Sequence, residues 1–321
     1  MSNPQSGIFH EGSRFHRYIE VQLADVSVDS ATSDANADFN ECAAIKKVIA
    51  QCVAAIEENQ QREVFQVIAF SQNYWSRLSP QSVPEGLLDF PGYASHKDGA
   101  NKLRVAPATQ RQCFIWLHSD DLDALTDAYL EMVALFKPLA HVLFSCDGFV
   151  YRDSRDLTGF IDGSANPKDD ARFPVAVIAD GKVGAGGSFV LTQQWSHRLA
   201  KFHQLPEAEQ EQVIGRTKRD SIELSGDAMP ADSHVSRTDL KLDGVAQKIY
   251  RRSTPFVQAE QSGLYFLAFS TELSRFDVLL KSMYGHAVNC EAVHDRLTEF
   301  SEPISGSYWF APSSEALVAL R

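Results

Sequence analysis

Three groups of residues in the second half of the chain have the types needed for acid–base or metal chemistry. The first is the segment GFIDGSANP at residues 159–167, in which two glycines flank Ile161 and Asp162. Such residues are common in tight turns, so a plain turn is one interpretation. The other is that Asp162 acts as an acid–base group beside apolar neighbours, while the glycines let the backbone approach a flat ligand closely.

The other two groups are a histidine and a pair of arginines. His234 lies in the polar stretch DSHVSR, which has no helical stripe of apolar residues, and a neutral imidazole is a common metal ligand. Arg251 and Arg252 stand between aromatic residues in YRRSTPF. Taken singly, His234 is equally well explained as an ordinary surface or core residue. The two arginines are equally well explained as surface charge, because paired arginines are usually solvated.

The elements that must position these residues alternate between strands and helices. In the first half, apolar and alternating runs predict strands over residues 15–23, 64–70, 112–118 and 141–151, and a loop over residues 26–38. Apolar residues at helical spacing predict helices across 45–56 and 122–136. The resulting order is that of the ferredoxin-like fold, which predicts an antiparallel sheet with two helices on one face.

The second half repeats this order more loosely. It has expected strands over 187–195, 263–270 and 307–311, and expected helices over 206–215 and 276–284. We therefore expect an α+β protein of two ferredoxin-like domains, residues 1–152 and 153–321.

Composition and charge restrict the partners of the protein. The chain has 321 residues, 44% of them hydrophobic, and a net charge of −12, so nucleic acid is a poor partner for it. No apolar run reaches the ~20 residues of a membrane helix, and the start of the chain resembles no signal peptide. The five cysteines form no C-x-x-C pair, which is typical of reduced thiols. We therefore expect a cytoplasmic protein with no membrane partner.

The three groups, taken in their order, resemble the dye-decolorizing peroxidase family, most closely its compact bacterial branch. The resemblance is carried by GFIDGSANP, the histidine at 234 and the segment RRSTPF at 251–256. The segments IAFSQNYW, PEGLLDFPG and IGRTK are also similar, so the likeness extends over most of the chain.

The resemblance implies haem b, held mainly by the second domain. His234 matches the family's iron ligand, and Asp162 and Arg251 match its distal aspartate and arginine. Gly163, Ser164, Ser253, Leu264 and Phe266 are the further candidates for cofactor contact. Some relatives have Asn at the position of Ser253, and Leu264 and Phe266 are equally well explained as core residues.

An iron-bound imidazole usually donates its other N–H to a carboxylate or carbonyl group. We expect Glu299 to be that acceptor, the alternative being an exposed surface residue. Bulky dyes would not fit a buried pocket, so Trp195, Tyr250, Tyr308 and Trp309 are candidates for relaying electrons to the surface, or are packing residues.

The implied activity is a haem peroxidase that reduces hydrogen peroxide and oxidises dyes, phenols or other small organic donors. One alternative is a haem- or porphyrin-binding protein that releases iron, as a deferrochelatase would. Another is a ferredoxin-like module with no cofactor. Sheets of this kind often leave edges uncovered, so we also expect a homo-oligomer, a dimer or larger.

Overall fold

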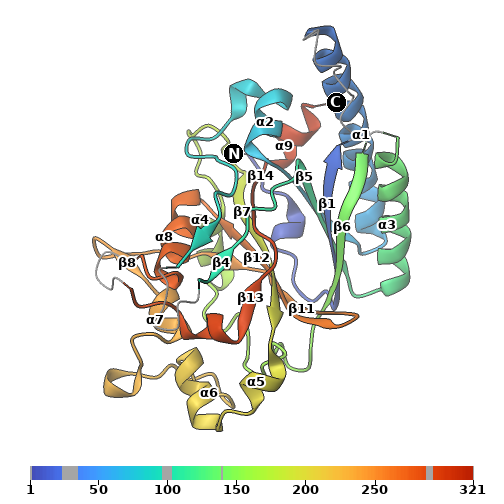
Figure 1. Cartoon of the computed structure of the whole chain (residues 1–321). Helices are drawn as coiled ribbons and strands as arrows, with labels where there is room; N and C mark the ends of the chain where they lie inside the picture. The colour runs from blue at the N-terminus through green and yellow to red at the C-terminus, as the bar shows by residue number, and fades with distance from the viewer. Residues whose placement is uncertain (1, 24–34, 96–102, 139, 287–291, 321) are drawn as a thin grey trace.

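The computed structural model describes residues 2–23, 35–95, 103–138, 140–286 and 292–320 (Figure 1). The first half has four main strands in the spatial order β6-β1-β5-β2, each antiparallel to its neighbours. The helices α1 and α3 cover the outer face of this sheet (Figure 1). The bounds of these elements are β1 (Phe15–Leu23), α1 (Ala35–Gln61), β2 (Phe65–Phe70), β5 (Cys113–Ser119), α3 (Leu122–Phe136) and β6 (Ala140–Phe149).

These strands and helices agree with the sequence prediction, with one exception. Helix α1 begins at Ala35, within the expected loop 26–38, because it continues for three turns ahead of its apolar stripe. The rest of that expected loop lies outside the described residues. Between β2 and β5, the described residues include α2 (Gln72–Leu78), a short 3-10 helix (Pro80–Ser82), β3 (Tyr93–Ala94) and β4 (Val105–Ala106).

The second half contributes four more main strands in the order β11-β12-β7-β14. Their bounds are β7 (Ser188–His197), β11 (Thr254–Gln258), β12 (Gln261–Ser270) and β14 (Ser307–Ala311). The helices and short strands around them are α4 (Phe173–Ala176), α5 (Leu199–His203), α6 (Glu207–Ile214), α7 (His234–Thr238), β8 (Lys241–Leu242), β9 (Val245–Ala246), β10 (Tyr250–Arg251), α8 (Leu273–Met283), β13 (Ser301–Pro303) and α9 (Ser314–Val318).

The two halves share one sheet, which the sequence analysis did not anticipate. The edge strands of one half pair with those of the other, β6 with β11 and β2 with β14, and the sheet closes into a barrel. The physical reason is that an isolated four-stranded sheet would leave both edges with unpaired backbone groups. Among the strands that the structure describes, β10 and β13 belong to this sheet and lie beyond the ring of eight.

Alternating side chains divide the core between the two faces of the sheet. On β1, Tyr18 points into the barrel with Trp116 and Tyr265, whereas Ile19 points outward to the helices. The outer face of β7 and β12 packs against α8, and α7 packs beside α8. Among the described residues, no helix has both the length and the apolar character needed to cross a bilayer.

Candidate active site

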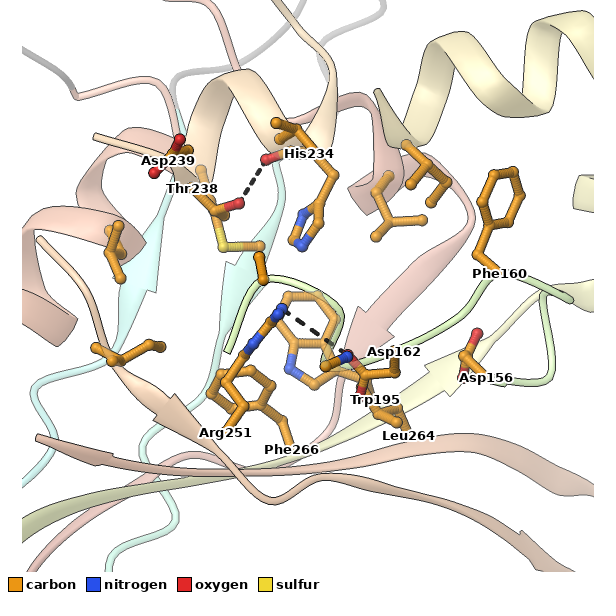
Figure 2. A pocket seen from close by; sticks show the side chains of 18 of the residues that line it. Asp156, Phe160, Asp162, Trp195, His234, Thr238, Asp239, Arg251, Leu264 and Phe266 are labelled. Atoms are coloured by element: carbon orange, nitrogen blue, oxygen red, sulfur yellow. Dashed lines mark hydrogen bonds and ion pairs between the residues drawn. The ribbon is translucent and has the colours of Figure 1, made fainter. Parts of the chain in front are cut away.

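A cavity of about 260 Å³ lies between the outer face of β7 and β12 and the helices α7 and α8. Its walls are mainly apolar and include Leu191, Trp195, Leu264, Phe266, Leu280 and Met283. Polar side chains enter it from two sides. His234 comes from the helix side, and Asp162 and Arg251 come from the side opposite (Figure 2).

His234 is the first residue of α7 and points its ring into the cavity (Figure 2). The preceding residue, Ser233, caps the helix by accepting a hydrogen bond from the backbone N–H of Ser236. The imidazole Nδ1 lies 2.6 Å from Oδ2 of Asp295, whose side chain is fully buried. Nδ1 therefore donates to the carboxylate, and Nε2 is left with a lone pair for a ligand in the cavity.

The prediction that Glu299 is the carboxylate partner of His234 is wrong. Asp295 holds that position, while Glu299 lies 3.5 Å from Arg104 and 3.6 Å from His294. Asp295 is fixed because its other oxygen accepts from the backbone N–H of Leu297 at 2.9 Å and caps the short helix that follows. That cap places the carboxylate of Asp295 beside His234, and Asp295 stands four residues before Glu299 in the sequence.

Asp162 is held in place by its own turn. Its Oδ1 accepts from the backbone N–H of Gly163 at 2.7 Å, and its backbone N–H donates to Ser154. Gly163 has a φ of 75°, a conformation that residues with a Cβ atom rarely adopt. The turn thereby presents the carboxylate to the cavity, and Gly163 and Ser164 line it too, as predicted.

Arg251 reaches the cavity from β10. Its Nη1 lies 3.8 Å from Oδ1 of Asp162, and both side chains are about three-quarters buried (Figure 2). At that distance the two groups attract each other without a direct hydrogen bond. The structure thus brings together Asp162, His234 and Arg251, the three residues on which the sequence prediction depends.

Comparisons with known proteins found a matching family model and similar relatives. Residues 153–316 match the family model of the Dyp-type peroxidase C-terminal domain. A dye-decolorizing peroxidase from Mycobacterium tuberculosis is 30% identical over 78% of this chain and 74% of that protein.

The chain belongs to the Dyp-type peroxidase family. Two similar structures extend the likeness over nearly the whole chain. A dye-decolorizing protein from V. cholerae has a TM-score of 0.83 and 33% identity, covering 98% of each chain. DyPB from Rhodococcus jostii RHA1 has a TM-score of 0.85 and 27% identity, covering 98% of this chain and 97% of the other, and variants of it were solved in complex with heme.

The remaining predicted contacts of this peroxidase divide between two cavities. Leu264 and Phe266 line the main cavity, as expected. Ser253 instead lines a neighbouring cavity of about 220 Å³, which meets the first at Asp162, Gly163 and Arg251. The Ser253 hydroxyl accepts from the backbone N–H of Leu267 at 3.3 Å, so it is tied to β12.

Sequence reasoning missed a polar network in the lining of the peroxidase cavity. His197 bonds Ser301 through Nδ1 at 2.7 Å and Asp156 through Nε2 at 3.0 Å. Burial by itself would raise the pKa of Asp156, but His197 and the hydrogen bonds from Thr158 outweigh it and lower that pKa from 3.8 to about 2. Asp156 stands only six residues before Asp162, and this closeness to the motif was the signal in the sequence that could have pointed to it.

The four aromatic residues suggested as electron relays are all buried. Tyr250, Tyr308 and Trp309 are at most 1% exposed, and Trp195 lines the cavity at 7%. None of them presents a ring at the surface for a bulky dye to touch.

Proposed function

We propose that this Dyp-type peroxidase holds haem b in the main cavity, with His234 as the iron ligand and Asp162 and Arg251 as the groups that act on hydrogen peroxide. The observation that carries the proposal is the opposition of groups across one apolar cavity. An imidazole with one available nitrogen faces a carboxylate and a guanidinium 3.8 Å apart.

The chemistry of the side chains fits a haem. Leu264 and Phe266 on one side and the α8 residues Leu280 and Met283 on the other offer apolar contacts for a porphyrin. His234 offers a neutral nitrogen, and its bond to the buried carboxylate of Asp295 makes that nitrogen a stronger donor. Arg251 offers a permanent charge for a propionate.

Asp162 is the proposed proton carrier. When bound, haem supplies the two-electron chemistry by which peroxide is reduced and two organic molecules each lose one electron. Peroxide must lose a proton from one oxygen and gain a proton on the other. Oδ1 of Asp162 is engaged by Gly163, so we assign the proton to Oδ2, which can take and return it.

Arg251 is the proposed electrostatic group. Its guanidinium stays charged at any working pH, and it lies on the same side of the cavity as Asp162. Negative charge that develops on the departing oxygen is therefore stabilised by a fixed positive group in an apolar setting.

The relatives called dye-decolorizing peroxidases support dyes as the organic electron donors, and phenols or similar small molecules are our further proposal. Because the four candidate relays are buried, electrons from a bulky dye would have to cross protein before reaching any of them. Iron release from haem, the alternative function, needs the cavity and His234 but has no evident use for Asp162 and Arg251. Their placement favours peroxide reduction.

We also propose that the chain is built from two ferredoxin-like units, residues 1–152 and 153–321. Each half has strands in the order 4-1-3-2 of that fold, and the C-terminal family model begins at residue 153, which supports this division. The cytoplasmic location and the homo-oligomer stay predictions, and light scattering of the purified protein measures the second.

The test separates peroxidase activity from iron release. The haem-loaded protein is given peroxide and a phenolic donor in one experiment, and a reductant without oxygen in another. We expect rapid oxidation of the donor that is lost on Asp162→Asn and Arg251→Leu together, with no free iron in the second experiment. Iron release with donor oxidation unchanged in the double variant would overturn the proposal.

A further inference from the structure

Asn166 contacts the backbone of Arg251 through both ends of its side-chain amide. Its Nδ2 donates to the carbonyl oxygen of Arg251 at 2.7 Å, and its Oδ1 accepts from the backbone N–H of Arg251 at 3.0 Å. One side chain thus takes the place that a neighbouring strand would occupy beside Arg251.

The edge of β10 needs such a partner. β10 is an end strand of the sheet and pairs with β12 on one side. Because the backbone N–H of Arg252 donates to Leu267, the backbone groups of the residue before it, Arg251, point away from β12. Without Asn166 both of these groups would lose their partner, and the strand that carries the guanidinium would lose its outer support.

Asn166 and Asp162 belong to one turn. The backbone N–H of Asn166 donates to the carbonyl of Gly163 at 2.9 Å, next to the residue whose carboxylate enters the cavity. Across the described residues, the two hydrogen bonds of the Asn166 side-chain amide are the only ones that join residues 159–167 to residues 247–256. The turn that carries Asp162 is therefore attached to the strand that carries Arg251 by this one side chain.

The two reacting side chains do not set their own separation. Arg251 Nη1 and Asp162 Oδ1 lie 3.8 Å apart, which is too far for a hydrogen bond, so no direct bond fixes their geometry. Their relative position must come from the backbone segments that carry them.

We propose that Asn166 is a positioning residue of this peroxidase, which fixes the guanidinium of Arg251 relative to the carboxylate of Asp162. The proposal rests on the roles proposed above for those two residues. This role requires a side chain whose end carries both a hydrogen-bond donor and an acceptor, so that it can bond the carbonyl oxygen and the N–H of Arg251 together. Ala has neither, and ionised Asp has no donor.

The chain contains a control for this clamp, by which we mean the pair of hydrogen bonds between the Asn166 side chain and the Arg251 backbone. Gln110 grips the backbone of Tyr308 in the same way, with its Nε2 donating at 2.8 Å and its Oε1 accepting at 2.9 Å. Neither Gln110 nor Tyr308 lines either of the two cavities. Gln110→Ala therefore removes a pair of bonds of the same kind without touching the site. It also removes the bonds of Gln110 to the backbone N–H of Phe90 at 3.1 Å and to the carbonyl oxygen of Arg111 at 3.2 Å, so it is the more severe of the two changes.

The experiment compares Asn166→Ala, Asn166→Asp, Gln110→Ala and Arg251→Leu in the haem-loaded protein. The rate constant for the reaction with peroxide is measured by stopped flow, and amide hydrogen exchange is measured in the peptide that contains Arg251. For Asn166→Ala we expect a rate 10- to 100-fold lower, the size of a displacement of about 1 Å, and faster exchange at Arg251. For Gln110→Ala, which loses more hydrogen bonds, we expect a fall in melting temperature at least as large, with a rate within twofold of wild type.

Asn166→Asp adds a readout that a merely structural role would not give. A protonated carboxyl group has both an O–H donor and a carbonyl acceptor, whereas the ionised group repels the carbonyl oxygen of Arg251. The rate of this variant relative to wild type should rise as the pH falls below about 4. A constant ratio across that range, or an unchanged rate in Asn166→Ala while Arg251→Leu is slow, overturns the clamp. An unchanged rate in Arg251→Leu overturns the role of Arg251 itself.

Discussion

Replacing Asp295 by Asn tests whether a buried carboxylate controls the imidazole of His234. Asp295 accepts two hydrogen bonds, from Nδ1 of His234 at 2.6 Å and from the backbone N–H of Leu297 at 2.9 Å. Asn has one oxygen and can accept only one of them. The variant that keeps the helix cap therefore loses the charged bond to the imidazole, which contributes about 1.5–3 kcal/mol.

Mutation of the hydrogen-bond partner of a metal-bound imidazole typically lowers the affinity for the metal by roughly 10- to 100-fold. We expect the haem affinity of Asp295→Asn to be lower than that of wild type by this factor, as measured by transfer of haem to a competing haem-binding protein. We also expect the reduction potential of the iron to rise. Two controls separate the causes. Glu299→Gln changes the carboxylate that the sequence favoured, and Asp121→Asn changes a cap at α3 that accepts from Asp123 and Ala124. Equal haem affinity in Asp295→Asn and wild type, with both folded, would refute the reasoning.

Two further predictions concern charge at the site. Arg251→Leu should slow the reaction with peroxide by about 10²- to 10³-fold, the effect of removing one preorganised charge-stabilising donor, and stopped-flow absorbance measures it; a change below threefold would contradict its role. The lowered pKa of Asp156, about 2 against 3.8 when unfolded, stabilises the fold above pH 4 and is lost as the pH falls toward 2. The difference in unfolding free energy between wild type and Asp156→Asn should therefore shrink by about 1 kcal/mol between pH 5 and pH 3, as urea titrations at the two pH values would show.

Local patterns in the sequence were enough to predict most strands and helices. The alternating run at 15–23 became β1, and the helical stripe at 45–56 lies within α1. Two elements that build the site were not expected. α7 has five residues and no apolar stripe, and β10, which carries Arg251, has only two residues.

Contacts between distant segments explain the other differences. Closure of the sheet depends on pairs such as Phe310 with Phe70, which no local pattern reveals. The same holds for Asp295, because its distance to His234 depends on how the segment after α8 folds back on α7. By contrast Asp162, His234 and Arg251 could be named from their motifs, since each motif supplies both the reactive residue and its turn or strand.

The central claim is that His234 holds the haem iron, and one measurement tests it most directly. His234→Gly is loaded with haem, and its absorption spectrum is recorded before and after one equivalent of peroxide, with and without added imidazole. We predict that the variant shows an altered Soret band and no rapid change with peroxide, and that free imidazole restores both. A variant with the wild-type spectrum and the wild-type response in the absence of imidazole would contradict the account.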